Sequence, residues 1–323
     1  MGFPEVNFAA RLVRLKGLTP PIDVLRLAEQ YASVHLVVFP VQVDGVCLNL
    51  KQHGKRPRIL VNRNLPARRL RFTLAHELGH VIIPWHVGSI VDETQESHFD
   101  LAFAYWQLEG EANRFASELL MPSEWASLLI DQEKDPIAAT ERISTVADVS
   151  FAAAMVKVQS LLPAGYAFAK FVDNHLTYTG RSAGTLASVP KIAKAQVATL
   201  FPQAASHWVK TKGPEEYHLW HFHQQVPLSS SSRPWREVLD EIANDIAVPE
   251  QERGKFKQRV MAVLSSANSR VRSSRSPESV NSACIQRLQA NVGTIPHLER
   301  FIRHTKLHEL LAAKIAEFFH KAN

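Results

Sequence analysis

The chain has 323 residues, of which 46% are hydrophobic and 21% charged, with a modestly basic net charge of +6. This length predicts two or three domains, and the composition excludes an intrinsically disordered chain. Two cysteines exclude a disulfide framework, and neither a secretory signal nor an apolar run of membrane-spanning length is visible, so we expect a cytoplasmic protein without a membrane partner.

Helical spacing of apolar residues predicts helices in the first half of the chain at residues 20–32, 65–83 and 105–120, and a pair of short helices within 135–163. The β-branched runs at 34–43 and 58–62 are typical of strands. Asn64 can cap the helix that starts at residue 65, and Pro84 can end it. Residues 85–105 have an irregular pattern.

The pattern changes after residue 163. Residues 167–172 and 216–226 predict short strands, and residues 235–248 and 298–319 predict helices. A serine-rich stretch near residue 230 is typical of a linker. We therefore place one boundary between domains 1–163 and 164–323, with a possible sub-boundary near 230.

The segment RFTLAHELGHVII, residues 71–83, holds His76 and His80 four residues apart, with Glu77 directly after the first. On a helix the two imidazoles share a face and can bind one tetrahedral ion, whereas Glu77 can reach a water on the open side. This HExxH arrangement is typical of a metallopeptidase with Glu77 as general base. The alternative is an amphipathic helix with two ordinary histidines. Gly79 favours the metal site, because it lets another element approach closely.

A third ligand is available in LEGEANRFASELLMP, residues 108–122. Glu109 and Asn113 share a helix face, whereas Glu111 points away from both, so we prefer Glu109 and keep Glu111 as the rival. Asn113 could accept a hydrogen bond from the far nitrogen of a metal-bound histidine and orient its ring.

Cys47, in VDGVCLNLK, precedes the predicted strand at 58–62 and the predicted metal-binding helix at 65–83. At a sheet edge beside that helix, its thiolate could occupy the fourth position on zinc and hold the enzyme inactive, as a cysteine switch. A small buried strand cysteine is the commoner fate of such residues, and both readings stay open.

Two features of the second half could bind further partners. A basic run without acids could attract phosphate backbones, or be an ordinary solvated face; its cations are Arg253, Lys255, Lys257, Arg259, Arg270, Arg272 and Arg275. In YHLWHFH, His221 and His223 could bind a second metal, and the aromatic residues could stack on single-stranded bases. Packing within a sheet is the simpler explanation of this motif.

The segments RFTLAHELGH and EGEANRFASELLMP, preceded by RILVNRNLPARR, together resemble the ImmA/IrrE family of metallo-endopeptidases. The resemblance is dense over residues 34–122, and ISTVADVSFAAAMVKV resembles the helix-turn-helix-like segment that closes the family's peptidase domain. It implies that His76, His80 and Glu109 bind one zinc ion and that Glu77 is the catalytic base. The same donor set could also hold manganese or iron.

The resemblance also implies an α+β fold: a zincin-like peptidase domain with a small sheet, then a C-terminal α/β sensor-like and helical region. The family's known substrates are helix-turn-helix repressors, cut once in responses to DNA damage, stress or phage. We therefore expect such a repressor as substrate, regulation by the C-terminal region, and single-stranded DNA as a candidate activator. The alternative is a nucleic-acid-binding transcriptional regulator whose peptidase domain is vestigial or a scaffold.

Overall fold

A computed structural model describes residues 3–93, 99–202, 204–224, 233–271 and 275–320, together with residues 226, 228 and 231. Its internal contacts divide the chain into two units, Met1–Leu161 and Leu162–Asn323, where the sequence placed a boundary near residue 163. A membrane-crossing helix would need a long apolar stretch, and none of the helices in the described ranges has one.

The first unit contains a four-stranded sheet of order β1-β3-β2-β4, with strands β1 (Ser33–Val37), β2 (Val43–Leu50), β3 (Arg58–Asn62) and β4 (Gly88–Glu93). Strand β3 is parallel to β1, and the other neighbours are antiparallel. The prediction of irregular structure over 85–105 was wrong, because β4 forms there and a helix begins at Phe99. The free edge of β2 supplies the hydrogen-bond partners of β4, and a local pattern does not reveal such a distant edge.

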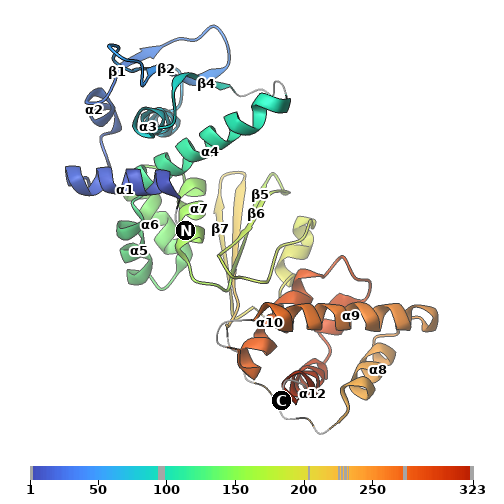
Figure 1. The fold of residues 1–323 in the computed structure, drawn as a ribbon. Helices are drawn as coiled ribbons and strands as arrows, with labels where there is room; N and C mark the ends of the chain where they lie inside the picture. Colours follow the sequence, from blue (N-terminus) through green and yellow to red (C-terminus); the bar gives the residue numbers. More distant parts are fainter. Residues whose placement is uncertain are drawn as a thin grey trace. The chain divides into compact units, whose positions relative to one another are not determined.

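The helices of the first unit are α1 (Pro4–Lys16), α2 (Val24–Glu29), α3 (Ala67–Ile82), α4 (Phe99–Leu120), α5 (Ser123–Gln132), α6 (Pro136–Val146) and α7 (Phe151–Leu161). Helix α3 lies beneath the sheet and packs against both β2 and α4 (Figure 1). It begins after Pro66, which is its N-cap, so the predicted cap at Asn64 was wrong. The fixed φ of proline suits a helix start without any side-chain cap.

A buried ion pair joins the end of α4 to α7. Lys157 Nζ lies 2.6 Å from Glu118 Oε2, and both side chains are almost fully buried. The backbone N–H and the hydroxyl of Ser123 donate to the same carboxylate at 2.9 and 2.6 Å. These bonds hold α7 and the start of α5 against the helix that carries Glu109.

The second unit begins with an antiparallel sheet of order β6-β5-β8-β7, with strands β5 (Tyr166–Val172), β6 (His175–Arg181), β7 (Ser206–Lys212) and β8 (Glu215–His221). One face of this sheet packs against the segment around the 3-10 helix η1 (Lys194–Thr199). Trp220 and Phe222 are central to that core, where Phe201 meets both rings edge-on at 5.1 Å.

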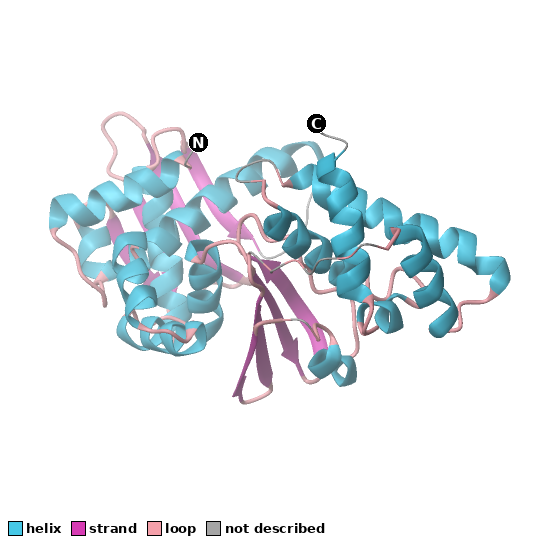
Figure 2. Cartoon of the chain, turned by 90° about the horizontal axis from the view of Figure 1, so that it is seen from below, coloured by secondary structure: helices cyan, strands magenta, loops and turns pink. Residues whose placement is uncertain are grey.

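A helical bundle completes the second unit, with α8 (Trp235–Asp245), α9 (Glu250–Arg270), α10 (Pro277–Ala290), α11 (Leu298–Ile302) and α12 (Leu307–His320). In Figure 2 the strands of this unit form one sheet and its helices a separate group. The helices share one apolar core, which includes Val260, Leu264 and Leu288. The single helix predicted over 298–319 is broken between α11 and α12, so that both can pack into this core.

Candidate metal centre

Three side chains from two helices converge in the first unit. His76 and His80 project from α3 with their Nε2 atoms 3.0 Å apart. Glu109 of α4 approaches both, with 3.0 Å from Oε2 to His76 Nε2 and 3.5 Å from Oε1 to His80 Nε2. All three are buried, and they form the one group of potential metal ligands found within the described ranges.

This donor set fits a divalent transition metal. Two imidazole nitrogens and one carboxylate are a typical ligand set of catalytic zinc, and ligands about 2.0–2.1 Å from a tetrahedral ion lie about 3.3 Å from one another. Glu109 Oε1 is buried and has no hydrogen-bond partner within the described part of the chain, as expected of an oxygen that faces an ion. Burial lowers the pKa of His80 well below its usual value, and His76 lowers it further, which keeps the ring neutral.

Asn113 lies where it can orient the first histidine. Its Oδ1 is 3.0 Å from His76 Nδ1. Because that amide oxygen can only accept, His76 must donate from Nδ1 and therefore presents the lone pair of Nε2 toward Glu109 and His80.

Glu111 orients the second histidine through an intermediate ring that the sequence reasoning missed. His80 Nδ1 lies 2.7 Å from His86 Nδ1, and His86 Nε2 lies 3.0 Å from Glu111 Oε2. The Glu111 carboxylate accepts a hydrogen bond from the Nε2–H of His86. His86 Nδ1 is then unprotonated and accepts a hydrogen bond from the Nδ1–H of His80. The Nε2 atom of His80 therefore carries a free lone pair. The rival third ligand, Glu111, therefore contacts His86, whereas Glu109 reaches the histidine pair. The only hint in the sequence was a histidine soon after the helix-ending Pro84.

Glu77 lies on the sheet side of α3 and is 1% exposed. Its carboxylate is so close to β2 that a Cβ at Gly45 would be 2.2 Å from Glu77 Oε1 and 2.9 Å from Thr73 Cγ2. A larger residue at position 45 would therefore displace the Glu77 carboxylate. Gly79 has the expected role on the opposite side of α3, where Phe115 of α4 would lie 3.1 Å from an added Cβ.

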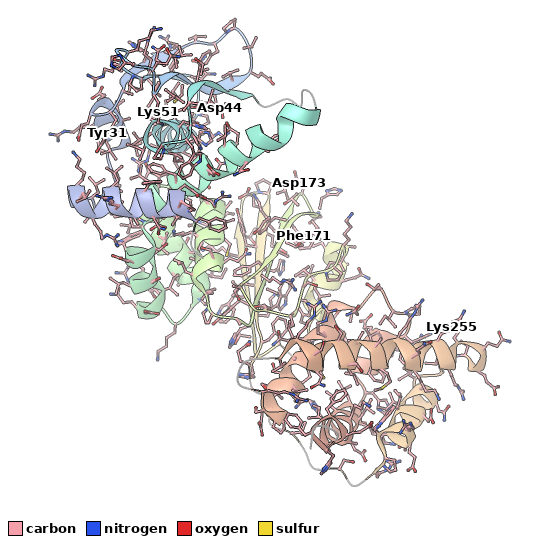
Figure 3. The ribbon with its side chains drawn as sticks, in the orientation of Figure 1. Tyr31, Asp44, Lys51, Phe171, Asp173 and Lys255 are labelled. Atoms are coloured by element: carbon pink, nitrogen blue, oxygen red, sulfur yellow. The ribbon has the colours of Figure 1, made fainter. Side chains whose placement is uncertain are left out.

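Strand β2 runs along α3 in the same direction and is fastened to it at both ends. Arg69, in the first turns of α3, pairs with Asp44 at 2.6 Å. Lys51 donates to the carbonyls of His80 and Val81 at 2.7 and 2.9 Å, near the negative end of the helix dipole. Figure 3 labels Asp44 and Lys51 beside α3. Burial lowers the pKa of the Lys51 ammonium to about 8.

Cys47 lies on β2, which is an interior strand between β3 and β4, and not at the sheet edge where the sequence reasoning placed it. Its thiol is fully buried and donates to the carbonyl oxygen of Glu77 at 3.3 Å. Burial, followed by the nearby Glu77 carboxylate, raises the pKa of Cys47 well above its usual value. Cys47 is not a member of the ligand group, and the cysteine switch stays a prediction.

A cavity of about 290 Å³ lies along the first turns of α3. Its wall is formed by α3, the end of α4 and the start of α7, with the lining residues Arg68, Arg69, Phe72, Leu120, Met121, Val149, Ser150 and Ala153. Phe72 is one helical turn before His76, and the two ring centroids are 6.4 Å apart. The buried Leu120, Met121 and Val149 make its floor apolar.

The remaining candidates lie in the second unit. His221 stacks on Tyr166, and His223 meets His221 edge-on, but neither belongs to a metal-ligand group of the described residues. In the basic run, Arg253 donates to the carbonyl of Val248, Lys257 pairs with Asp240, and Arg275 lies over the Phe319 ring. Arg272 lies outside the described residues. Lys255, Arg259 and Arg270 also belong to α9.

Comparison with known proteins found a similarity that lies within the first unit. No curated protein matches the chain. A family model of the IrrE N-terminal-like domain matches residues 29–158, which include the whole ligand group, Glu77 and most of α7. This match confirms the resemblance drawn from the two motifs. Residues 29–158 are therefore similar to the IrrE N-terminal-like domain, and this similarity supports a metallopeptidase of the ImmA/IrrE type.

Proposed function

We propose that the protein is a zinc-dependent endopeptidase that cleaves a helix-turn-helix repressor in a DNA-damage, stress or anti-phage response. The observation that carries the proposal is the convergence of buried His76, His80 and Glu109, with the buried Glu77 directly after His76 on the same helix. The second layer of hydrogen bonds from Asn113 and from His86 and Glu111 supports an active site, because a vestigial site needs no such layer.

The side chains of the site supply the proton transfers of peptide hydrolysis. A bound zinc ion would polarise the substrate carbonyl and lower the pKa of a water molecule. Glu77 accepts the proton of the attacking water and delivers it to the amine nitrogen that leaves. Gly45 leaves the space that the Glu77 carboxylate occupies, and Asn113 and His86 keep the two histidines in the tautomer that binds a metal.

The histidine relay predicts a loss of metal affinity in His86→Phe. This variant keeps a ring of similar shape but removes the acceptor for His80 Nδ1, so the affinity for zinc should fall about 10- to 100-fold. Competition with a fluorescent chelator measures the change. Trp85→Phe is the matched control, because it removes the 2.5 Å bond from Trp85 Nε1 to Glu111 but keeps an aromatic ring beside His86 and the bond from His86 to Glu111, so zinc affinity should be unchanged. Equal affinities in wild type and His86→Phe would contradict the relay.

The apolar cavity beside Phe72 predicts where a substrate side chain binds. Ala153→Phe would fill this cavity and should lower kcat/KM for the repressor about tenfold or more. Val156→Phe is the control on the same helix, because Val156 is exposed and does not line the cavity. Steady-state cleavage of a peptide that spans the scissile bond provides the measurement. A normal kcat/KM in Ala153→Phe would show that the substrate does not use this cavity.

The test of the proposed function is cleavage of the helix-turn-helix repressor encoded beside the gene. We expect the zinc-loaded protein to cut it once, and a chelator to stop the reaction until zinc is restored. Single-stranded DNA is added in parallel, to test whether the second unit regulates cleavage. Equally fast cleavage of unrelated unfolded proteins would contradict a dedicated repressor protease. No cleavage under any condition would favour the nucleic-acid-binding regulator.

A further inference from the structure

The second unit contains a buried arginine atom without a partner. Arg287 belongs to α10, whose neighbouring residues are almost all buried in the helical core. Its Nε is shielded from solvent and has no hydrogen-bond partner within the described part of the chain. A buried donor that lacks an acceptor destabilises the fold, and more so when the group is charged. A ligand with anionic oxygens would supply the missing acceptor.

Two more arginines lie within electrostatic range of Arg287. Arg270 ends α9, which packs against α10, and Arg181 ends β6. The segment after β6 is tied to α10, because the Leu186 N–H donates to Gln286 Oε1 at 3.1 Å and Leu186 packs on the helical core. Arg181 pairs with Ala167 at the end of the β5–β6 hairpin opposite the turn at Asp173, which Figure 3 labels.

Arg270 and Arg181 each repel Arg287. Burial lowers the pKa of Arg287, and the charges of Arg270 and Arg181 lower it further. Neither Arg270 nor Arg287 forms an ion pair with any residue that the structure describes. An anion between them would neutralise the repulsion and accept the Nε–H bond. Guanidinium groups suit phosphate in particular, because their planar N–H donors match two phosphate oxygens at once.

The charge continues along α9 beyond these three arginines. Lys255, Arg259 and Arg270 are separated by 4 and 11 residues and therefore share one face of this helix. Lys255 and Arg259 are exposed and likewise make no ion pair among the described residues. At 1.5 Å per residue, Lys255 and Arg270 lie about 22 Å apart along the axis, which exceeds the reach of a single nucleotide.

We propose that Arg181, Arg270 and Arg287, extended along α9 by Arg259 and Lys255, bind the phosphate backbone of a nucleic acid strand. The arginine cluster holds one phosphate group in bidentate contacts, and the α9 stripe follows the next phosphates of the strand. Lys257 does not take part, although it belongs to the same basic run, because Asp240 already neutralises it. The proposal does not depend on peptidase activity, because binding alone tests it.

The experiment is fluorescence anisotropy of a labelled single-stranded oligonucleotide with the full chain, at salt concentrations from about 50 to 200 mM. We expect Arg287→Gln and Arg270→Gln each to weaken binding about tenfold, and to reduce the slope of log affinity against log salt by about 0.7 for each lost phosphate contact. Lys257→Gln is the matched control on α9 and should bind as the wild type does. Arg181→Gln should also weaken binding, and because Arg181 is exposed this substitution should not disturb the fold.

Competition separates a strand from a small phosphate ligand. Unlabelled oligonucleotide should displace the probe at far lower phosphate concentration than ATP or inorganic phosphate does. The proposal is overturned if the wild type does not bind the oligonucleotide, if ATP competes equally well per phosphate, or if Lys257→Gln weakens binding as much as Arg287→Gln. Circular dichroism of each variant establishes that the fold is intact before binding is compared.

Discussion

Glu77→Gln should keep its metal and lose peptide cleavage by about a hundred- to ten-thousand-fold, the usual contribution of a general base. The glutamine amide has nearly the shape of the carboxylate, so it fits the space beside Gly45, but it cannot take a proton from water. The repressor cleavage rate in single-turnover conditions measures the loss. Zinc content, measured on the same preparation, should equal that of the wild type, because Glu77 does not belong to the ligand group.

Two further variants make this result specific. Glu109→Gln should lose both zinc and activity, which would separate a ligand from a base. Glu124→Gln changes an exposed glutamate in the same unit and should leave both properties unchanged. Substantial cleavage by Glu77→Gln would show that another group accepts the proton. Loss of zinc from Glu77→Gln would instead make Glu77 a structural part of the metal site.

Lys157→Met should lower the free energy of unfolding of the first unit by about 3–5 kcal/mol. The substitution leaves the Glu118 carboxylate buried without its countercharge, with only the Ser123 donors remaining. Because the chain has two units, hydrogen exchange of peptides from α4 and α7 in increasing urea is the suitable measurement. The second unit should unfold at an unchanged urea concentration.

A double variant and a surface pair test the reason for this loss. Adding Glu118→Gln to Lys157→Met removes the unpaired charge while keeping an oxygen for Ser123, so part of the stability should return. Arg142→Met breaks the Arg142–Glu133 pair, whose side chains are 46% and 33% exposed, and should cost less than about 1 kcal/mol. A cost of Lys157→Met as small as that of Arg142→Met would show that the buried pair does not stabilise the unit.

Local periodicity was sufficient to predict the helices of the site and the residues that share their faces. A spacing of four puts His76 and His80 on one side of α3, and Glu109 and Asn113 on one side of α4, whatever the rest of the chain does. The boundary near residue 163 could also be predicted, because composition and periodicity change there. These features depend on residues within a few turns of one another.

Other features of the site depend on residues distant in sequence. The pairing of β4 with β2, the contact of Lys51 with the end of α3, and the relay from His80 through His86 to Glu111 each join separate segments. Pattern alone could not show that Gly45 lies against Glu77 or that Cys47 is on an interior strand, because strand order is decided by packing of the whole sheet.

The sequence by itself therefore determined which side chains could form a metal centre, because the candidate ligands and the candidate base occur at helical spacing in two short motifs. Only the tertiary structure decided which charges are neutralised. In the basic run, Arg253 and Lys257 have partners within the second unit, whereas the charge of Arg270 acts on Arg287 of the neighbouring helix. Charge along a chain is a property of sequence, but its neutralisation depends on which surfaces the fold brings together.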